Sequence, residues 1–181
     1  MRVIAGQFRG RNLVSVKGSN IRPAADRVKE TIFNILQNRL SLEGALVLDL
    51  FAGTGSLGLE TISRGAAHAV FVDATETSLR LLRANIGRLR CESLCSVIDL
   101  DAMRFIETTD KRFDLIFADP PYAFESTTTI PEIIFRRNLL EKKGILIIEH
   151  SKSTEIPESP RYQTDVRKQF GRTVVSFFSE R

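Results

Sequence analysis

The stretch Leu46–Glu60 (LVLDLFAGTGSLGLE) restricts the possible folds of this chain more than any other segment. An apolar run typical of a strand buried on both faces is followed by a glycine-rich turn and then by a helical pattern. In this order, strand, turn and helix N-terminus present free backbone N–H groups to a ligand. Gly53, Gly55 and Gly58 also fit the pattern G-x-G-x-x-G, and Asp73 lies 20 residues beyond Gly53. By pattern alone, the turn could therefore hold NAD or FAD.

Asp49 favours a different ligand. A dinucleotide would place its pyrophosphate at this turn, where a nearby carboxylate would repel it. S-adenosylmethionine instead carries a sulfonium and an ammonium group, and a carboxylate attracts both. The spacing Asp49-x-Phe51-x-Gly53-x-Gly55 therefore suits a cationic ligand, and it resembles motif I of the class I S-adenosylmethionine-dependent methyltransferases. A turn without a ligand is disfavoured, because a strained backbone and an acid at a strand end are both costly without a use.

Two further acids follow predicted strands and could bind the adenosyl part of such a cofactor. Asp73 ends an apolar run, and its carboxylate could accept both ribose hydroxyls; the alternative is an acid that begins a helix. Asp101 follows a short strand, and we prefer it to Asp99 as the acceptor for the adenine amine. An N-cap role for Asp101 is compatible with that contact. We place Ala102, which opens the next helix, in the same predicted cofactor site.

A second motif with chemical content follows the strand predicted at 113–118: Asp119-Pro120-Pro121-Tyr122. Two consecutive prolines fix φ and remove two N–H groups, so the local backbone is rigid and offers only carbonyl acceptors. The Asp119 carboxylate and the Pro120 carbonyl could accept both protons of an exocyclic base amine, while Tyr122 could stack on the base. These bonds would favour a pyramidal nitrogen whose lone pair points at the methyl group. Holding the nitrogen and the methyl carbon in line lowers the activation free energy by roughly 7–11 kcal/mol in favourable cases. A plain strand-ending turn is the alternative.

Positive charge is concentrated at the start of the chain. Residues 1–40 contain eight of the 26 Lys and Arg residues and two of the 22 acids, so they carry +6 while the remainder carries −2. A clustered basic excess indicates a polyanionic partner, although a solvated basic face is the simpler interpretation.

The N-terminal segment places some of this charge beside an aromatic ring. Residues 2–16 alternate loosely and predict a β-hairpin with its turn near Gln7–Gly10, with arginines near Phe8. Arginine interleaved with an aromatic ring suits phosphate contact and base stacking. A helix is expected from Pro23 to about Leu40. The predicted RNA-contacting residues are Arg2, Arg9, Arg11, Arg22 and Arg27.

The rest of the chain alternates predicted strands and helices. Strands are expected at about 45–50, 69–73, 95–98, 113–118, 145–149, 162–169 and 173–179, and helices at about 56–64, 76–90, 102–106 and 130–140. The tight connection at Gly171 implies an antiparallel final hairpin. The fold class is therefore α/β: a Rossmann-like, doubly wound sheet of seven mostly parallel strands. We divide the chain into a basic N-terminal extension, residues 1–40, and a methyltransferase domain, residues 41–181.

Composition excludes several other classes. No apolar run approaches the length of a membrane span, and the first residues are too short for a signal-peptide core, so we expect a cytoplasmic protein. Cys91 and Cys95 have neither a redox nor a metal-ligand spacing, and we expect them to be reduced. His68 and His150 are isolated, so no metal site is predicted. We expect a monomer.

Several segments together resemble one family, the bacterial 16S rRNA guanine-N2 methyltransferases of the RsmD type. They are MRVIAG-FRGR-L, IRPAADRVKETIFNIL, VLDLFAGTGSLGLE, RGA, FVD, FADPPY and GRTVVSFF, and they span nearly the whole chain. The glycine motif and D-P-P-Y alone are shared with adenine-N6 and cytosine-N4 methyltransferases. The first 40 residues and the short length give the narrower resemblance. It implies methyl transfer from S-adenosylmethionine to N2 of one guanine in 16S rRNA, on an assembled or partly assembled 30S particle.

The resemblance also assigns residues. It places Asp49, Phe51, Gly53, Gly55, Asp73 and Asp101 at cofactor positions, and Asp119, Pro120, Pro121 and Tyr122 in the catalytic motif. Two features depart from the family pattern. Ala24-Ala25 replaces the expected threonines, and Asp73 is one methylene shorter than the usual glutamate.

Three other functions are compatible with parts of the sequence. The nearest alternative is an adenine-N6 methyltransferase acting on DNA or rRNA. A nicotinamide-dependent oxidoreductase could use the same glycine turn, but the chain offers no clear proton donor or second-substrate site. A non-catalytic RNA-binding module would need only the basic N-terminal segment.

Overall fold

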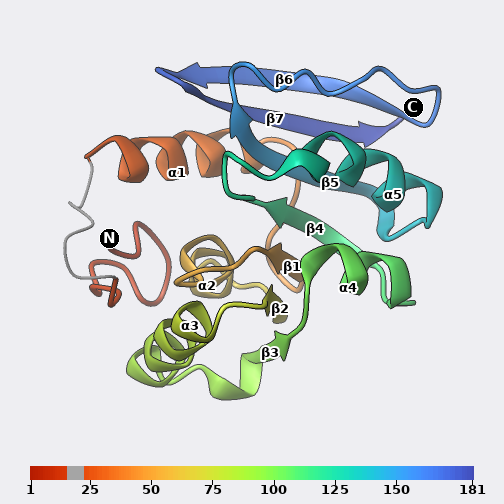
Figure 1. Ribbon diagram of the computed structural model, residues 1–181. Helices are drawn as coiled ribbons and strands as arrows, with labels where there is room; N and C mark the ends of the chain where they lie inside the picture. Colours follow the sequence, from red (N-terminus) through yellow and green to blue (C-terminus); the bar gives the residue numbers. More distant parts are fainter. Residues whose placement is uncertain (16–22) are drawn as a thin grey trace.

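A seven-stranded sheet forms the centre of the computed structural model, which describes residues 1–15 and 23–181 (Figure 1). The strand order is β3-β2-β1-β4-β5-β7-β6; β3 through β5 are parallel, and the β5, β7 and β6 neighbours are antiparallel. The strands are β1 Leu46–Leu50, β2 His68–Asp73, β3 Cys95–Asp99, β4 Phe113–Ala118, β5 Leu140–Ser151, β6 Tyr162–Phe170 and β7 Thr173–Glu180. The predicted fold class is confirmed, including the antiparallel final hairpin.

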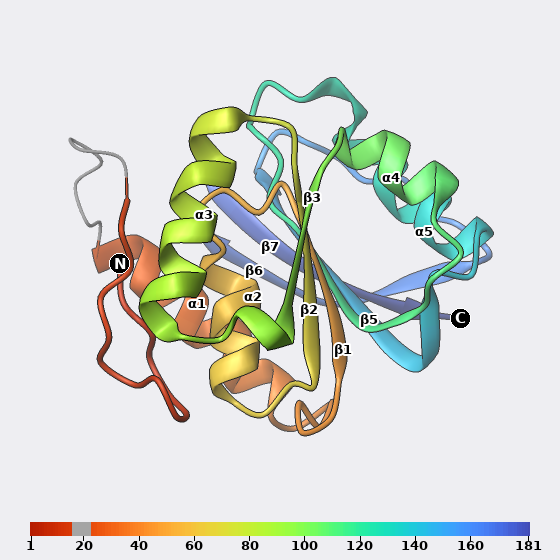
Figure 2. The same ribbon diagram turned by 90° about the horizontal axis from the view of Figure 1, so that it is seen from below.

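Helices cover both faces of the sheet (Figure 2). On one face lie α1 Pro23–Leu36, α2 Ser56–Ser63 and α3 Glu76–Leu89, and on the other lie α4 Ala102–Thr108 and α5 Ile130–Arg136. Two short 3-10 helices, η1 Glu92–Leu94 and η2 Glu125–Thr129, connect these elements. Within the described ranges, no helix combines the length and apolar character that crossing a bilayer requires.

Each central strand contributes to two hydrophobic cores. In β1, Val47 packs in the core under α1–α3, whereas the adjacent Leu48 packs in the core under α4 and α5, and both are fully buried. Successive side chains of a strand point to opposite faces, so a strand covered on both sides needs apolar residues at every position. This requirement explains the continuous apolar runs in the sequence.

Three element boundaries differ from the prediction by four or more residues. The helix α5 ends at Arg136 and not near Leu140, because Asn138 adopts a left-handed conformation with φ 53° and turns the chain toward the sheet. The strand β5 then begins at Leu140, five residues early, and pairs with Phe113 before an irregularity in the ladder. α1 ends at Leu36, four residues before the predicted end.

The N-terminal segment doubles back as predicted, but it forms one antiparallel bridge, between Arg2 and Asn12, in place of a two-stranded ladder. The reason is that α2 supplies partners for its backbone. Gln7 N donates to Ser63 O at 2.8 Å, and Phe8 N donates to Ser63 Oγ at 2.9 Å. Cross-strand bonds are therefore confined to the ends of the segment, where Val3 N donates to Arg11 O and Leu13 N donates to Met1 O, both at 3.0 Å.

Candidate active site

A cavity of about 520 Å³ opens at the carboxyl ends of the parallel strands. This is the edge at which open α/β sheets bind ligands. Nine of the eleven predicted cofactor and catalytic residues line it: Phe51, Gly53, Asp73, Asp101, Ala102, Asp119, Pro120, Pro121 and Tyr122. The topology therefore brings the glycine turn and the D-P-P-Y motif, some 65 residues apart in sequence, to one space.

Asp73 joins the glycine turn to the start of α3. Its Oδ2 accepts from Gly53 N at 2.9 Å, and its Oδ1 accepts from Thr75 N at 2.8 Å. Gly53 has φ +55°, a conformation that glycine adopts without a steric cost. Each carboxylate oxygen offers two acceptor positions, so Asp73 can hold this turn and still accept from a ligand in the cavity.

Phe51 is held in an unusual conformation at the cavity wall. Its φ of 56° lies in the left-handed region, which costs a non-glycine residue about 1–2 kcal/mol. The ring packs edge-on against Phe124, with 5.0 Å between the ring centroids. Such a conformation persists only where the surroundings impose it, and such sites are concentrated at ligand-binding turns.

Asp101 performs the N-cap role predicted as compatible with ligand binding. Its carboxylate accepts from Arg104 N at 2.9 Å at the start of α4, and the residue also lines the cavity. Ala102, the first residue of the helix, lies beside it in the wall and is buried.

Asp49 and Gly55 are the two predicted cofactor residues that do not line the cavity. Asp49 is 2% exposed, and its Oδ2 accepts from Gly58 N at 2.9 Å in the first turn of α2. Gly55 has φ +78°, and a Cβ there would lie 2.4 Å from Leu82 Cδ1. Both residues therefore lie behind the glycine turn, where they hold α2 against the sheet.

Burial, together with the charges of neighbouring acids, raises the pKa values of three acids at this site. The pKa of Asp49 is raised to about 8, mainly by burial; the hydrogen bond from Gly58 opposes this rise, and the charges of Asp119 and Asp73 contribute to it. Asp119 is exposed to the cavity, yet the protein around it raises its pKa to about 6. Burial and the Asp119 charge raise the pKa of Glu149 to about 8. A cation in the cavity would stabilise the ionised form of each acid.

Replacing Asp49 with asparagine should stabilise the ligand-free protein at high pH. In the folded protein the pKa of Asp49 is about 8, whereas an unperturbed aspartate titrates near 4. The unfolded chain therefore releases this proton between about pH 4 and pH 8 while the folded protein keeps it, so Asp49 lowers the free energy of unfolding as the pH rises through that window. Asparagine keeps an acceptor for Gly58 N without this cost.

Denaturant titrations at about pH 5, 7 and 9 would measure the effect. The Asp49→Asn variant should gain stability over the wild type as the pH rises, and Asp99→Asn, a change at an exposed acid, is the matched control. A stability difference independent of pH would contradict the raised pKa of Asp49.

Two hydrogen bonds hold the C-terminal half of the D-P-P-Y corner. Phe124 N donates to Pro121 O at 2.7 Å, and the Tyr122 hydroxyl is hydrogen-bonded to Thr173 Oγ1 of β7. Tyr122 is 61% exposed, so its ring forms an open surface at the cavity. The corner therefore combines a rigid backbone with an accessible aromatic face.

Glu149 is a cavity residue to which the sequence analysis assigned no role. It ends the apolar run of β5, much as Asp49 lies one residue before the end of β1, Asp73 ends β2 and Asp119 follows β4. An acid at that position of a fourth strand was the available signal. Ala74, Thr75 and Ser78 were also missed, and they line the cavity from the start of α3. Among the described residues, no group of His, Cys, Asp and Glu side chains could hold a metal ion.

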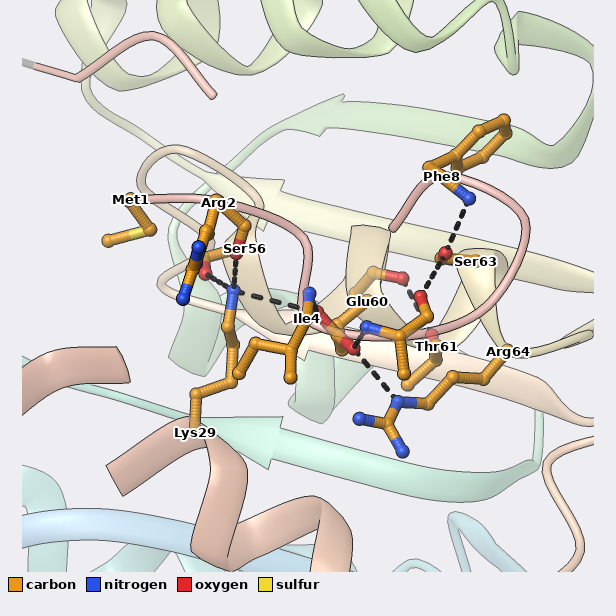
Figure 3. Close-up of polar contacts among 12 residues, drawn as sticks. Met1, Arg2, Ile4, Phe8, Lys29, Ser56, Glu60, Thr61, Ser63 and Arg64 are labelled. Carbon is orange, nitrogen blue, oxygen red and sulfur yellow. Dashed lines mark hydrogen bonds and ion pairs between the residues drawn. The ribbon is translucent and has the colours of Figure 1, made fainter. Parts of the chain in front are cut away.

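Glu60 anchors the N-terminal segment to α2 (Figure 3). It is fully buried, and its carboxylate accepts from Ile4 N at 2.8 Å and from Ala5 N at 3.0 Å. Arg64 Nε donates to the same carboxylate at 2.9 Å, and Lys29 Nζ of α1 lies 3.6 Å from it. One side chain therefore connects the N-terminal segment, α1 and α2.

Lys29 completes this connection (Figure 3). Its Nζ donates to Arg2 O at 2.6 Å and to Ser56 Oγ at 3.1 Å, at the start of α2. Burial lowers the pKa of Lys29, and the Glu60 carboxylate opposes that shift. The sequence analysis treated Lys29 only as part of the basic excess, but the structure buries it.

The predicted RNA-contacting arginines lie on the surface where the structure describes them. Arg2, Arg9, Arg11 and Arg27 are exposed, and within residues 1–15 and 23–181 none forms an ion pair. The Arg11 guanidinium lies 5.5 Å from the centre of the Phe8 ring, as the hairpin pattern predicted. Arg22 lies outside the described residues. Four guanidinium groups are therefore available to a polyanion.

Comparison with known proteins gives consistent matches. The family model described as conserved hypothetical protein 95 matches residues 1–179. The chain is 36% identical to a putative rRNA methyltransferase, YlbH, of Bacillus subtilis over the full length of both proteins. It is 34% identical to ribosomal RNA small subunit methyltransferase D of Haemophilus influenzae, over 84% of this chain and 79% of that one. The solved structure of a putative methyltransferase, yhhF, from Escherichia coli superposes with a TM-score of 0.86 at 28% identity, covering 99% of this chain and 97% of the other.

Proposed function

The chain belongs to the family of conserved hypothetical protein 95, and from this membership and the cavity described above we propose that it is a 16S rRNA methyltransferase that uses S-adenosylmethionine. The proposed acceptor is the exocyclic N2 of one guanine in the small ribosomal subunit. The observation that carries the proposal is that one cavity joins the glycine turn and the acids after β2 and β3 to the D-P-P-Y corner.

The residues of the cavity fit this cofactor. S-adenosylmethionine would supply an electrophilic methyl group on a sulfonium. The Asp73 carboxylate would accept from the ribose hydroxyls, and the Asp101 carboxylate would accept from the adenine amine. Asp49 would act from behind the turn, by attracting the cationic methionine end and by positioning the backbone N–H groups of the turn.

The opposite wall of the cavity fits the acceptor nitrogen. That nitrogen is a weak nucleophile because its lone pair is delocalised into the ring. The Asp119 carboxylate and the Pro120 carbonyl would accept its two protons, while the base stacks on Tyr122. A pKa of about 6 leaves Asp119 largely ionised, and so a strong acceptor, at neutral pH.

The exposed arginines would bind the rRNA backbone. Arg2, Arg9 and Arg11 lie on the N-terminal segment that Glu60 holds against α2, and Arg27 lies on α1. Their contacts with phosphates would fix the position of the RNA without reading its sequence. Arg22 belongs to the same proposed set.

Transfer of labelled methyl groups tests the proposal. The protein is incubated with labelled S-adenosylmethionine and either 30S subunits or naked 16S rRNA, both prepared without the modification. Nucleoside analysis should find the label in N2-methylguanosine, and mass mapping should place it at one nucleotide. Label in N6-methyladenosine would favour the nearest alternative. No label from a folded protein that binds S-adenosylmethionine would count against methyl transfer to rRNA, and binding of NADH in its place, measured by calorimetry, would favour an oxidoreductase.

A further inference from the structure

Glu149 lies beside the proposed catalytic acid on the neighbouring strand. In the parallel β4–β5 ladder, Ala118 is opposite Ile148. Asp119 directly follows this pair at the end of β4, and Glu149 follows it within β5, so the two acids lie close together at the carboxyl edge of the sheet. The Asp119 charge contributes to the raised pKa of Glu149, as expected for two acids at close range.

Asp119 and Glu149 also separate two cavities. A second cavity of about 130 Å³ lies between the N-terminal segment, α1 and the start of α2, and these two acids are the residues that it shares with the large cavity. Much of its remaining wall is apolar, including Val28, Ile32 and Leu57. The two acids are therefore reached from either cavity, and a planar base stacked on Tyr122 in the large one would meet both carboxylates at their common edge.

Neither carboxylate has a donor within the part of the chain that the structure describes. The hydrogen bonds and ion pairs of the described residues include none to the side chains of Asp119 and Glu149, although other acids of the cavity wall, such as Asp73 and Asp101, accept backbone N–H groups. Asp119 is exposed to the cavity and Glu149 is half-buried, so the acceptor positions of both are open to a molecule in the cavity. A ligand that presents two adjacent N–H groups would satisfy both.

We propose that Glu149 is the residue that selects guanine, by accepting the N1–H of the target base while Asp119 accepts an N2–H. This inference rests on the proposed function. Guanine carries N1–H directly beside its 2-amino group, so two neighbouring carboxylates match its edge. In the free protein the pKa of about 8 leaves Glu149 largely protonated at neutral pH, and donation from the guanine N1–H lowers that pKa because it stabilises the charged carboxylate. Adenine presents an unprotonated N1 beside its amine, so it cannot stabilise the charged form, and its lone pair would face the carboxylate wherever Glu149 is ionised.

The test compares guanine with 2-aminopurine at the target nucleotide. 2-Aminopurine keeps the 2-amino group and stacking surface but has no N1–H. Above about pH 8, where Glu149 is ionised, the wild-type protein should methylate guanine with a kcat/KM roughly 10–100-fold higher, because 2-aminopurine cannot donate to the carboxylate. This preference should shrink at lower pH, where the protonated Glu149 can itself donate to the unprotonated N1. In Glu149→Gln the amide can also donate to an unprotonated N1. This variant should lose activity on guanine, keep it on 2-aminopurine, and show nearly equal values for the two substrates.

Control measurements separate a change in base selection from a loss of folding or of cofactor binding. Glu141→Gln, a change at an exposed position of the same strand, should keep the wild-type ratio of the two substrates. Thermal unfolding and calorimetry with S-adenosylmethionine show whether Glu149→Gln folds and binds cofactor. Equal losses on both substrates, or a wild-type protein that treats them alike, would overturn the role of Glu149 while leaving guanine-N2 transfer intact. Absence of transfer to guanine by the wild type would overturn the proposed function, and this inference with it.

Discussion

Replacing Asp119 with alanine should lower kcat by roughly 10²–10³-fold and leave the dissociation constant of S-adenosylmethionine nearly unchanged. The reason is that the carboxylate lies at the D-P-P-Y wall of the cavity, while the acids expected to hold the cofactor lie after β2 and β3. Its bonds to the amine become strongest as the nitrogen develops positive charge, so their loss affects the transition state more than cofactor binding.

Single-turnover methylation of 30S subunits at saturating cofactor would measure kcat, and calorimetry would measure cofactor affinity. Asp119→Asn is the matched variant, since its amide oxygen still accepts one hydrogen bond, and its loss should be smaller than that of alanine. Equal losses of turnover and cofactor affinity in Asp119→Ala would show that Asp119 belongs to the cofactor site.

Replacing Glu60 with alanine should lower the free energy of unfolding by roughly 3–5 kcal/mol. Glu60 is fully buried, and its removal leaves Lys29, 4% exposed, as a buried charge without a carboxylate. Ile4 N and Ala5 N lose their acceptor in the same step. The N-terminal segment should therefore detach from α2 before the sheet unfolds.

Denaturant titration would measure the stability, and hydrogen exchange at residues 3–9 would measure the detachment. Glu107→Ala is the control: its pair with Arg136, at 3.1 Å, joins side chains that are 44% and 51% exposed. Its loss should cost less than about 1 kcal/mol. A similarly small cost for Glu60→Ala, with unchanged exchange at residues 3–9, would contradict the anchoring role of Glu60.

The parts of the site that were predictable are those whose chemistry is local in sequence. The glycine turn and the D-P-P-Y corner are runs of consecutive residues, so their backbone constraints could be recognised without knowing the fold. Alternating apolar strands and helices then predicted the sheet, and a parallel sheet brings the ends of its strands to one edge. For this reason Asp73, Asp101 and Asp119 were placed in one crevice, which is where they lie.

The parts that were missed depend on partners far apart in the chain. Glu60 and Ile4 are 56 residues apart, and no local pattern indicates that a buried carboxylate will take the N–H groups of a predicted hairpin. Asp49 was assigned to the cofactor site because of its charge, but the hydrogen bond from Gly58 N and the packing of α2 keep it buried behind the glycine turn. A role for Glu149 could be inferred only from the β4–β5 register, which brings it close to Asp119.

The attachment of the N-terminal segment at both ends of α2 makes this helix a spacer of fixed length. Lys29 ties Arg2 to Ser56 where the helix begins, and Ser63 binds Gln7 where it ends. Eight helical residues extend about 12 Å. A phosphate bound by the arginines of that segment would therefore lie at a fixed distance from the methyl group of S-adenosylmethionine in the cavity. Such a protein would select its target nucleotide in part by the distance between the target base and the phosphates that the arginines bind.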